Sequence, residues 1–176
     1  MSDLVVMLGD SLSAGNAWNR AFPGLAIRNM GVDGDTWAGL WNRLNEVAIL
    51  QPAKVFLQIG INDLLRGAPP DEIVAGHRRI WRDLGKKSPE TRLYVISLLP
   101  YLEEALPGLP PNLDIIYINL ALAEKAEQSG LDFINLFPLF ADEDYQLRLD
   151  YTSDGLHLTP KGYRVWEEAL RPVLEP

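Results

Sequence analysis

Short apolar runs alternate with longer amphipathic segments along the sequence, and this alternation restricts the fold more than any other feature. Five apolar runs, each bounded by Gly, Pro, Asn or Asp, predict strands at 4–8, 25–30, 55–59, 93–98 and 133–136. Four segments with a helical spacing of apolar residues predict helices at 36–50, 71–86, 113–129 and 161–174. Strands that alternate with helices favour a parallel sheet. We therefore expect an α/β fold, a three-layer α/β/α sandwich around a central five-stranded parallel sheet.

Several residues suit the ends of the predicted helices. Asp35 or Thr36 can cap the start of the first helix, and Thr159 followed by Pro160 suits the start of the last. Gly130 suits the end of the third helix. The proline-rich stretch 107–111 is expected to be a loop rather than a linker, because neither flank holds enough strands to fold alone. We expect residues 1–176 to form a single domain.

Composition excludes several classes of function. The 176 residues include no cysteine and two histidines, which rules out thiol nucleophiles, cysteinyl zinc sites, iron–sulfur clusters and an all-histidine metal cage. A net charge of −8 argues against a nucleic-acid partner. No stretch approaches the roughly 20 apolar residues of a membrane span. The sequence starts without a signal peptide, so we expect a cytoplasmic protein, although removal of a leader would leave the same sequence.

Four turns carry the residue types that acyl transfer requires. Three of them follow the first three predicted strands, at 9–13, 31–36 and 60–63, and the fourth, 154–157, precedes the last predicted helix. In an open parallel sheet, ligands bind beyond the carboxyl ends of the strands. We therefore expect the side chains of these turns to meet at one edge of the sheet.

Each turn supplies a distinct part of one mechanism. Ser11 is the candidate nucleophile, at a point where a strand turns into a helix, and His157 is the candidate base that takes its proton. Asp154 can hold the other ring nitrogen of His157. The candidate oxyanion donors are the backbone N–H groups of Ser11 and Gly34 and the side-chain amide of Asn62.

Taken singly, each of these motifs has a simpler structural explanation. Gly-Asp-Ser is common in turns, an Asp before a helix is often a cap, and Asn followed by Asp favours turn conformations. Ser13 and Thr36 are interpreted as caps rather than reactants, and His77 and Trp41 as packing residues on helices. The functional interpretation is favoured because all four turns occur in one sequence, and each carries a residue type that acyl transfer requires.

In these four turns the sequence resembles the SGNH hydrolases, the GDSL-type esterases and lipases. The matching blocks are Gly9-Asp10-Ser11-Leu12, Gly34-Asp35-Thr36, Gly60-x-Asn62-Asp63 and Asp154-x-x-His157, and the resemblance runs from Leu4 to about Trp166. Flanking phrases such as Ser97-Leu98-Leu99-Pro100 resemble the small bacterial acylhydrolase branch that includes platelet-activating-factor acetylhydrolase-like proteins. The resemblance implies a flavodoxin-like sandwich, ester hydrolysis without a cofactor or metal, and an active site open to solvent.

The favoured function is a serine esterase that acts on short acyl esters, including acetyl esters, of small molecules, with thioesterase or lysophospholipase activity as variants. The rival is a non-catalytic carbohydrate- or metabolite-binding protein on the same scaffold, which would not need an intact Ser, His and Asp set. Phosphoryl transfer is not favoured, because the sequence contains no Gly-rich phosphate-binding loop. The oligomeric state stays open. Candidate lining residues of the acyl or alcohol pocket are Trp18, Trp37, Leu65, Arg66, Tyr101 and Leu102.

Overall fold

The computed structural model describes residues 3–175 and contains a five-stranded sheet in the order β2-β1-β3-β4-β5. The strands are β1 (Val5–Gly9), β2 (Ile27–Gly31), β3 (Lys54–Gln58), β4 (Arg92–Ile96) and β5 (Asp132–Ile134). Each pair of neighbours is parallel. This is the strand order of flavodoxin-like, doubly wound sheets. The predicted parallel sheet is confirmed, with strand ends displaced by one or two residues.

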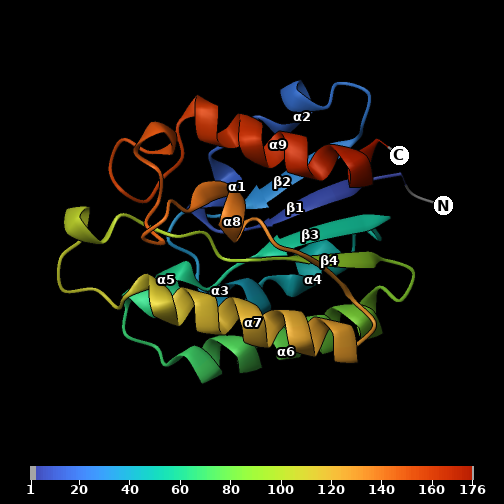
Figure 1. Cartoon of the computed structure of the whole chain (residues 1–176). Helices are drawn as coiled ribbons and strands as arrows, with labels where there is room; N and C mark the ends of the chain where they lie inside the picture. The colour runs from blue at the N-terminus through green and yellow to red at the C-terminus, as the bar shows by residue number, and fades with distance from the viewer. Residues whose placement is uncertain (1–2, 176) are drawn as a thin grey trace.

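Helices cover both faces of the sheet, which confirms the three-layer sandwich (Figure 1). One face carries α1 (Ser11–Ala14), α2 (Trp18–Ala21), α8 (Phe137–Phe140) and α9 (Pro160–Leu174). The other carries α3 (Trp37–Asn42), α4 (Leu44–Ala48), α5 (Ile61–Leu65), α6 (Pro70–Lys87) and α7 (Asn112–Gln128). Two short 3₁₀ turns, η1 (Glu103–Ala105) and η2 (Leu149–Tyr151), lie in the loops.

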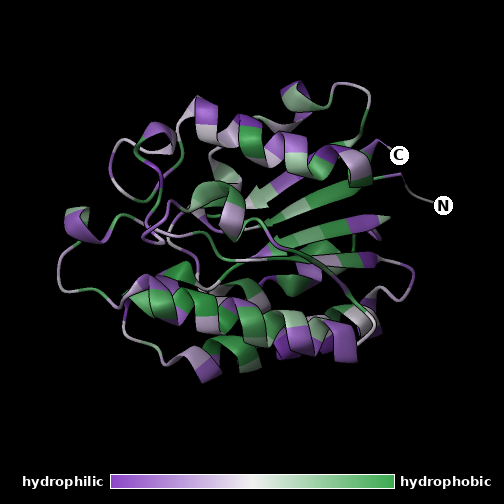
Figure 2. Ribbon diagram, viewed as in Figure 1, coloured by the Kyte–Doolittle hydropathy of each residue, from purple (hydrophilic) through white to green (hydrophobic). Residues whose placement is uncertain are grey.

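The middle strands form the core because both of their faces are covered. Every residue of β1 is buried, as are most residues of β3 and β4, whereas the edge strands β2 and β5 are partly exposed. Strands buried on both faces are apolar along their length rather than alternating. Figure 2 shows this as mainly green central strands between helices that carry both green and purple residues.

The predicted helix caps are partly confirmed. The hydroxyl of Thr36 accepts a hydrogen bond from the backbone N–H of Gly39 at the start of α3, and Thr159 caps α9 in the same way. Ser13, however, lies inside α1 and is not its cap. Asp10 caps α1, because its carboxylate accepts a hydrogen bond from the N–H of Leu12.

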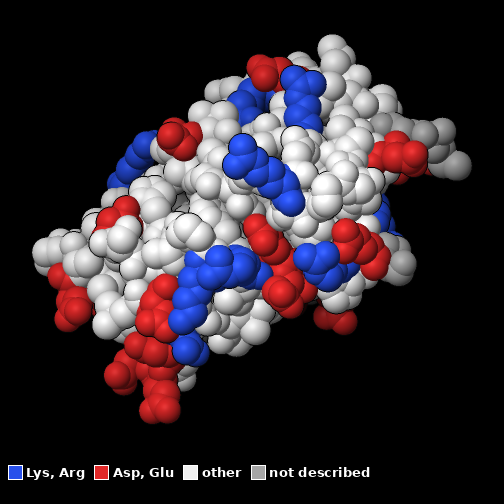
Figure 3. Space-filling view, turned by 90° about the horizontal axis from the view of Figure 1, so that it is seen from above, with Lys and Arg blue, Asp and Glu red and all other residues white. Residues whose placement is uncertain are grey.

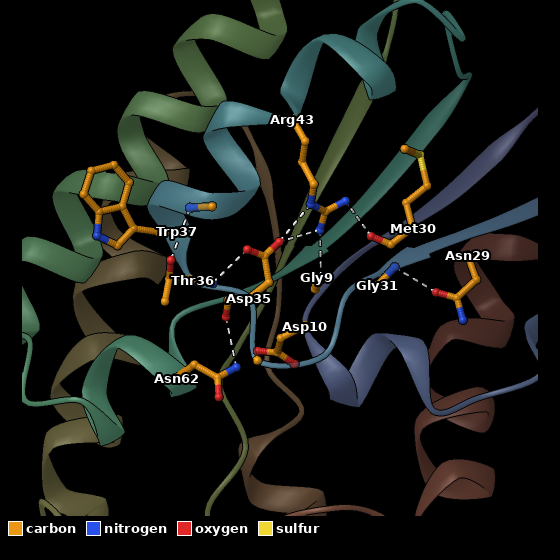
Figure 4. A network of polar contacts seen from close by, with 12 residues as sticks. Gly9, Asp10, Asn29, Met30, Gly31, Asp35, Thr36, Trp37, Arg43 and Asn62 are labelled. Atoms are coloured by element: carbon orange, nitrogen blue, oxygen red, sulfur yellow. Dashed lines mark hydrogen bonds and ion pairs between the residues drawn. The ribbon is translucent and has the colours of Figure 1, made fainter.

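The predicted continuous helix 36–50 is wrong, because it is divided into α3 and α4 at Arg43. Arg43 has φ −99° and ψ 9°, and it ends one helix and precedes the next. Its side chain points back toward the carboxyl ends of β1 and β2 (Figure 4).

The surface over α9 carries charges of both signs. Figure 3 shows Lys and Arg side chains interspersed with Asp and Glu on this face of the described chain, rather than one continuous basic area. Within residues 3–175, no helix is long and apolar enough to cross a membrane.

Candidate active site

Residues that follow the carboxyl ends of β1, β2 and β3 line an open cavity of about 510 Å³. Ser11 directly follows the turn after β1, Gly34 lies in the loop after β2, and Asn62 lies in α5 after β3. His157 comes from the loop before α9. These four residues, taken from four separate turns, line the same cavity. Its size is typical of a small-molecule site.

Ser11, His157 and Asp154 form a continuous chain of hydrogen bonds. The Ser11 Oγ lies 3.0 Å from Nε2 of His157, and Nδ1 of His157 lies 2.7 Å from Oδ2 of Asp154. The carboxylate side of this chain fixes the tautomer, because Nδ1 must carry the proton that Asp154 accepts. Nε2 is then left with a lone pair that faces the serine hydroxyl. This is the arrangement in which a histidine can remove a serine proton.

Asp154 also shapes the loop that carries His157. Its Oδ1 accepts hydrogen bonds from the backbone N–H groups of Leu156 at 2.9 Å and His157 at 2.8 Å, and from the Thr152 hydroxyl at 3.3 Å. Although its partial burial acts in the opposite direction, hydrogen bonds from the His157 ring and these backbone groups hold the pKa of Asp154 at about 2. The residue is therefore a carboxylate at neutral pH and can accept the ring proton.

The loop after β2 presents a free backbone donor next to the nucleophile. Gly34 has φ +70°, in the left-handed region that favours glycine, and it lies in the cavity wall with Ser11. In the described part of the chain, neither the N–H of Gly34 nor that of Ser11 has a hydrogen-bond acceptor. Both can therefore donate to a negatively charged oxygen in the cavity.

Side chains from α5 hold this loop at three points. The Asn62 amide donates to the backbone oxygen of Asp35 at 2.9 Å, and Asp63 accepts from the N–H of Trp37 at 3.0 Å. Arg66, just beyond α5, donates to the backbone oxygen of Gly34 at 2.9 Å. Asn62 uses one amide N–H in this way, and the residue lines the cavity. Its second N–H can therefore serve a bound ligand.

Two acidic residues lie buried under the site. Burial raises the pKa of Asp10 to about 7, even though the N–H of Leu12 hydrogen-bonds to one of its oxygens. The other oxygen of Asp10 has no hydrogen-bond partner among the described residues. Burial likewise raises the pKa of Asp63 to about 6, against the hydrogen bond from Trp37. Both carboxyls are more easily protonated than usual because ionisation in a desolvated position is costly.

None of the six candidate lining residues is among the residues that line the cavity. Trp18 is 1% exposed, and its indole N–H donates to the backbone oxygen of Ser13 at 2.8 Å. Tyr101 is fully buried, with its hydroxyl directed at the backbone oxygen of Pro110. Both side chains are in the core, so the expectation that they line a pocket is wrong.

The other four candidates also lie outside the cavity lining. Trp37 packs its ring against Gly76 of α6, and Leu65 packs against the core. Leu102 supports the histidine loop, since its N–H donates to the backbone oxygen of Gly155 at 2.7 Å. Arg66 is exposed and contacts the cavity wall through Gly34.

The cavity is also lined by five residues that the sequence analysis did not propose as site residues: Gly15, Asp33, Leu156, Leu158 and Tyr163. Three of them are immediate neighbours of Gly34 or His157, so their proximity to a motif was the available signal. Tyr163 comes from α9, and its hydroxyl donates to the backbone oxygen of Leu12 at 3.0 Å. Burial raises its pKa to about 12, so it stays a neutral donor.

His77 is separate from this site. It is fully buried on α6, and its Nε2 lies 2.7 Å from the backbone oxygen of Ile59. Burial lowers its pKa to about 4, so the ring is neutral near pH 7. The structure confirms the prediction that His77 packs in the core.

Comparison with known proteins agrees with these observations. The alpha1 subunit of platelet-activating factor acetylhydrolase IB from Homo sapiens is 28% identical over 176 residues, which covers 97% of this chain and 74% of that protein. A platelet-activating-factor-like protein from Streptococcus pneumonia has a TM-score of 0.86 at 26% identity, covering 98% of this chain and 84% of that one. A GDSL-like lipase from Bacteroides thetaiotaomicron shares the fold, with a TM-score of 0.85, 24% identity, and coverage of 98% and 88%.

The family model of the GDSL-like lipases and acylhydrolases matches residues 7–165, a span that includes all four motif turns. The site geometry and this match point the same way, and the chain belongs to the GDSL-like lipase/acylhydrolase family.

Proposed function

We propose that this protein is a serine esterase that hydrolyses short-chain acyl esters of small molecules through an acyl-enzyme intermediate. The observation that supports this most directly is the hydrogen-bond chain from Ser11 through His157 to Asp154, which opens into a cavity lined also by Gly34 and Asn62. A binding protein would gain nothing from this arrangement, whereas acyl transfer needs every part of it.

In the first half of the reaction, Ser11 Oγ attacks the carbonyl carbon of the ester while its proton moves to Nε2 of His157. The carbonyl oxygen becomes an oxyanion, which accepts hydrogen bonds from the N–H groups of Ser11 and Gly34 and from the Asn62 amide. Asp154 accepts a hydrogen bond from Nδ1–H of the resulting imidazolium and stabilises its charge. The bond to the alcohol then breaks, and His157 returns its proton to the departing alkoxide.

In the second half, a water molecule attacks the acyl group on Ser11 and gives its proton to His157. A second oxyanion forms in the same position. The bond between the acyl carbon and Ser11 Oγ breaks, the carboxylic acid leaves, and His157 returns the proton to Ser11. The side chains of His157 and Asp154 are 49% and 51% exposed, so water can reach the acyl-enzyme directly.

The shape of the cavity supports a short acyl group. It is open, and its apolar side chains in the described chain are Leu156, Leu158 and the Tyr163 ring, too few to bury a long hydrocarbon chain. The name of the human relative includes acetylhydrolase, which agrees with an acetyl or similarly small acyl group. Thioester and lysophospholipid hydrolysis would use the same steps with a different leaving group.

A panel of substrates tests this proposal. The purified protein is assayed with p-nitrophenyl esters from acetate to palmitate, an acyl thioester and a lysophospholipid, each beside the Ser11→Ala variant as the background control. We expect the highest kcat/KM with acetate or another short acyl group. Turnover no higher than that of Ser11→Ala on every substrate would overturn the esterase and favour a carbohydrate- or metabolite-binding protein.

A further inference from the structure

Arg43 connects three separate segments beneath the site. Its guanidinium donates to the backbone oxygen of Gly9 at 3.1 Å, to that of Met30 at 2.9 Å, and to the carboxylate of Asp35 at 2.8 Å (Figure 4). Gly9 ends β1 and Met30 lies near the end of β2. Asp35 follows Gly34 in the loop that carries a candidate oxyanion donor.

Each of these contacts lies close to a group that the proposed reaction uses. Gly9 is two residues before Ser11, and its oxygen also accepts the N–H of Val32 at 3.0 Å. Met30 and Asp35 bracket the loop that contains Gly34. Arg43 therefore holds the strand end before the nucleophile and both ends of the loop beside it.

Asp35 passes this restraint on to Asn62. Its backbone oxygen accepts the Asn62 amide at 2.9 Å, while its carboxylate binds Arg43 and accepts the N–H of Thr36 at 3.0 Å. The carboxylate fits closely against α3, since a Cβ at Gly39 would collide with its Oδ1. One residue thus links the arginine to an oxyanion donor by its side chain and its backbone.

The network is shielded enough to fix positions. The side chains of Arg43 and Asp35 are 16% and 9% exposed. A planar guanidinium can serve three acceptors in different directions, whereas a lysine ammonium at the end of a flexible chain cannot reproduce that geometry. Oxyanion donors are effective only when they already point to where the charge develops, and displacements of about 1 Å cost about 10²-fold in rate.

We propose that Arg43 is a positioning residue that sets the spacing between Ser11 and the oxyanion donors Gly34 and Asn62. It contacts no substrate, and its link to Asn62 runs through Asp35. The inference rests on the proposed function, because it assumes that Asn62 stabilises an oxyanion. It extends that function to a buried arginine outside the four motif turns.

The first test is a pair of substitutions, Arg43→Gln and Arg43→Lys, assayed with p-nitrophenyl acetate. We expect Arg43→Gln to lower kcat by roughly 10- to 100-fold with KM little changed, because ester binding does not require the oxyanion geometry. Arg43→Lys keeps the charge but not the three-way contact, so it should recover only part of kcat. Wild-type kcat in either variant would overturn the proposal.

Matched controls separate positioning from stability. Arg92→Gln removes an arginine–carboxylate pair of similar length, 2.9 Å to Asp132, at the other end of the sheet, and it should leave kcat unchanged. Gly39→Ala leaves Arg43 intact but displaces the Asp35 carboxylate, so it should reproduce the loss of kcat even if Arg43→Gln fails to fold. A normal kcat for Gly39→Ala would count against the proposed route through Asp35.

A double-mutant cycle with Asn62→Ala completes the test. If Arg43 acts through Asn62, Arg43→Gln should lower kcat at least about threefold less in the Asn62→Ala background than in the wild type. Equal effects in both backgrounds would overturn the inference while leaving the oxyanion hole intact. An Asn62→Ala protein with normal kcat would instead refute the proposed role of Asn62 itself, so the two failures are distinguishable.

Discussion

The two halves of the candidate active site are held in place in different ways. His157 and Asp154 lie on an exposed loop, with about half of each side chain accessible to water. Asn62, which lines the same cavity, is held by Asp35, which is itself held by a mostly buried Arg43 (Figure 4). The hydrogen bonds of Asp154 lie within its own loop, whereas Asn62 is held by residues from other segments.

The difference follows from what each half has to do. The proposed base, His157, must exchange protons with water and leaving groups, and its geometry is set by hydrogen bonds within the short loop 154–157. The proposed oxyanion donors have to be aimed before the reaction starts, so they need support from several elements. Substitutions at the exposed half should therefore change chemistry alone, whereas substitutions at the buried half should change both activity and stability.

The largest effect is expected from removing the nucleophile or the base. Ser11→Ala and His157→Ala should each lower kcat by on the order of 10⁴-fold or more, because the two groups act as a unit. The melting temperature should stay near that of the wild type, since both residues are partly or largely exposed. Activity assays and thermal melts on the same samples measure both quantities.

Ser153→Ala is the matched control, since this exposed serine lies next to Asp154. It should retain full activity. A phosphonyl fluoride should label Ser11 and leave Ser153 unmodified, and EDTA should have no effect on turnover. Labelling at another serine would move the nucleophile, and loss of activity with EDTA would indicate a carboxylate-bound metal.

A slightly smaller loss is expected for Asp154→Asn. The asparagine can still accept the backbone N–H groups of Leu156 and His157, so the loop should keep its shape. A neutral amide favours the wrong tautomer of the imidazole, which should cost roughly 10³- to 10⁴-fold in kcat. Measuring kcat with p-nitrophenyl acetate checks this. A loss of less than about tenfold would mean that another acceptor orients His157.

Asn62→Ala tests the buried half of the site. Loss of one oxyanion donor should lower kcat by about 10²–10³-fold with little change in KM. The structure also shows the Asn62 amide bonded to the loop, so the free energy of unfolding should fall by about 1 kcal/mol. The loss of kcat and the loss of stability can occur together, because one amide hydrogen can bond to the loop while the other bonds to the oxyanion.

Asn119→Ala is the control for Asn62→Ala. The Asn119 side chain makes two hydrogen bonds to the backbone of Leu98, away from the cavity lining, and is 6% exposed. We expect a larger loss of melting temperature than for Asn62→Ala, with kcat per folded molecule near wild type. An Asn62→Ala protein that behaved like Asn119→Ala, destabilised but fully active, would remove Asn62 from the site.

The smallest effect on turnover is expected for Asp10→Asn. This substitution should instead change how the stability of the protein depends on pH. Burial raises the pKa of Asp10 to about 7 in the folded protein, against an ordinary value of 3.8. The stability this carboxyl contributes is therefore complete below pH 3.8 and is lost as the pH rises through about 7. Asparagine has no such loss, and its Oδ1 can still cap α1.

Thermal melts of Asp10→Asn and wild type at pH 5 and pH 8 measure this. The melting temperature of the variant relative to wild type should rise by roughly 5 °C between the two pH values. His77, whose pKa burial lowers to about 4, contributes the opposite dependence, but it is present in both proteins and cancels in the difference. A difference that does not change with pH would mean that Asp10 stays ionised in the folded state.

Much of the fold could be predicted because the signals are local. Apolar runs bounded by Gly, Pro, Asn or Asp marked all five strands, and Thr36 and Thr159 marked helix starts through hydrogen bonds made within one turn. The turns carrying Ser11 and His157 were found because each motif occupies a few consecutive residues. The parallel arrangement of the strands then required three of the four turns to share an edge.

What the sequence by itself determined was the strand and helix order and the residue types at the four turns. Only the tertiary structure decided which aromatic side chains are buried, since Trp18 packs against Trp166, far away along the chain. The division of the helix at Arg43 was also decided by the tertiary structure alone. The helical spacing of apolar residues continues through that position, and the backbone oxygens that accept from the Arg43 guanidinium lie on other segments. Local hydrogen bonds and hydrophobic periodicity depend on residues that are close in sequence. Contacts between distant segments exist only once the chain has folded.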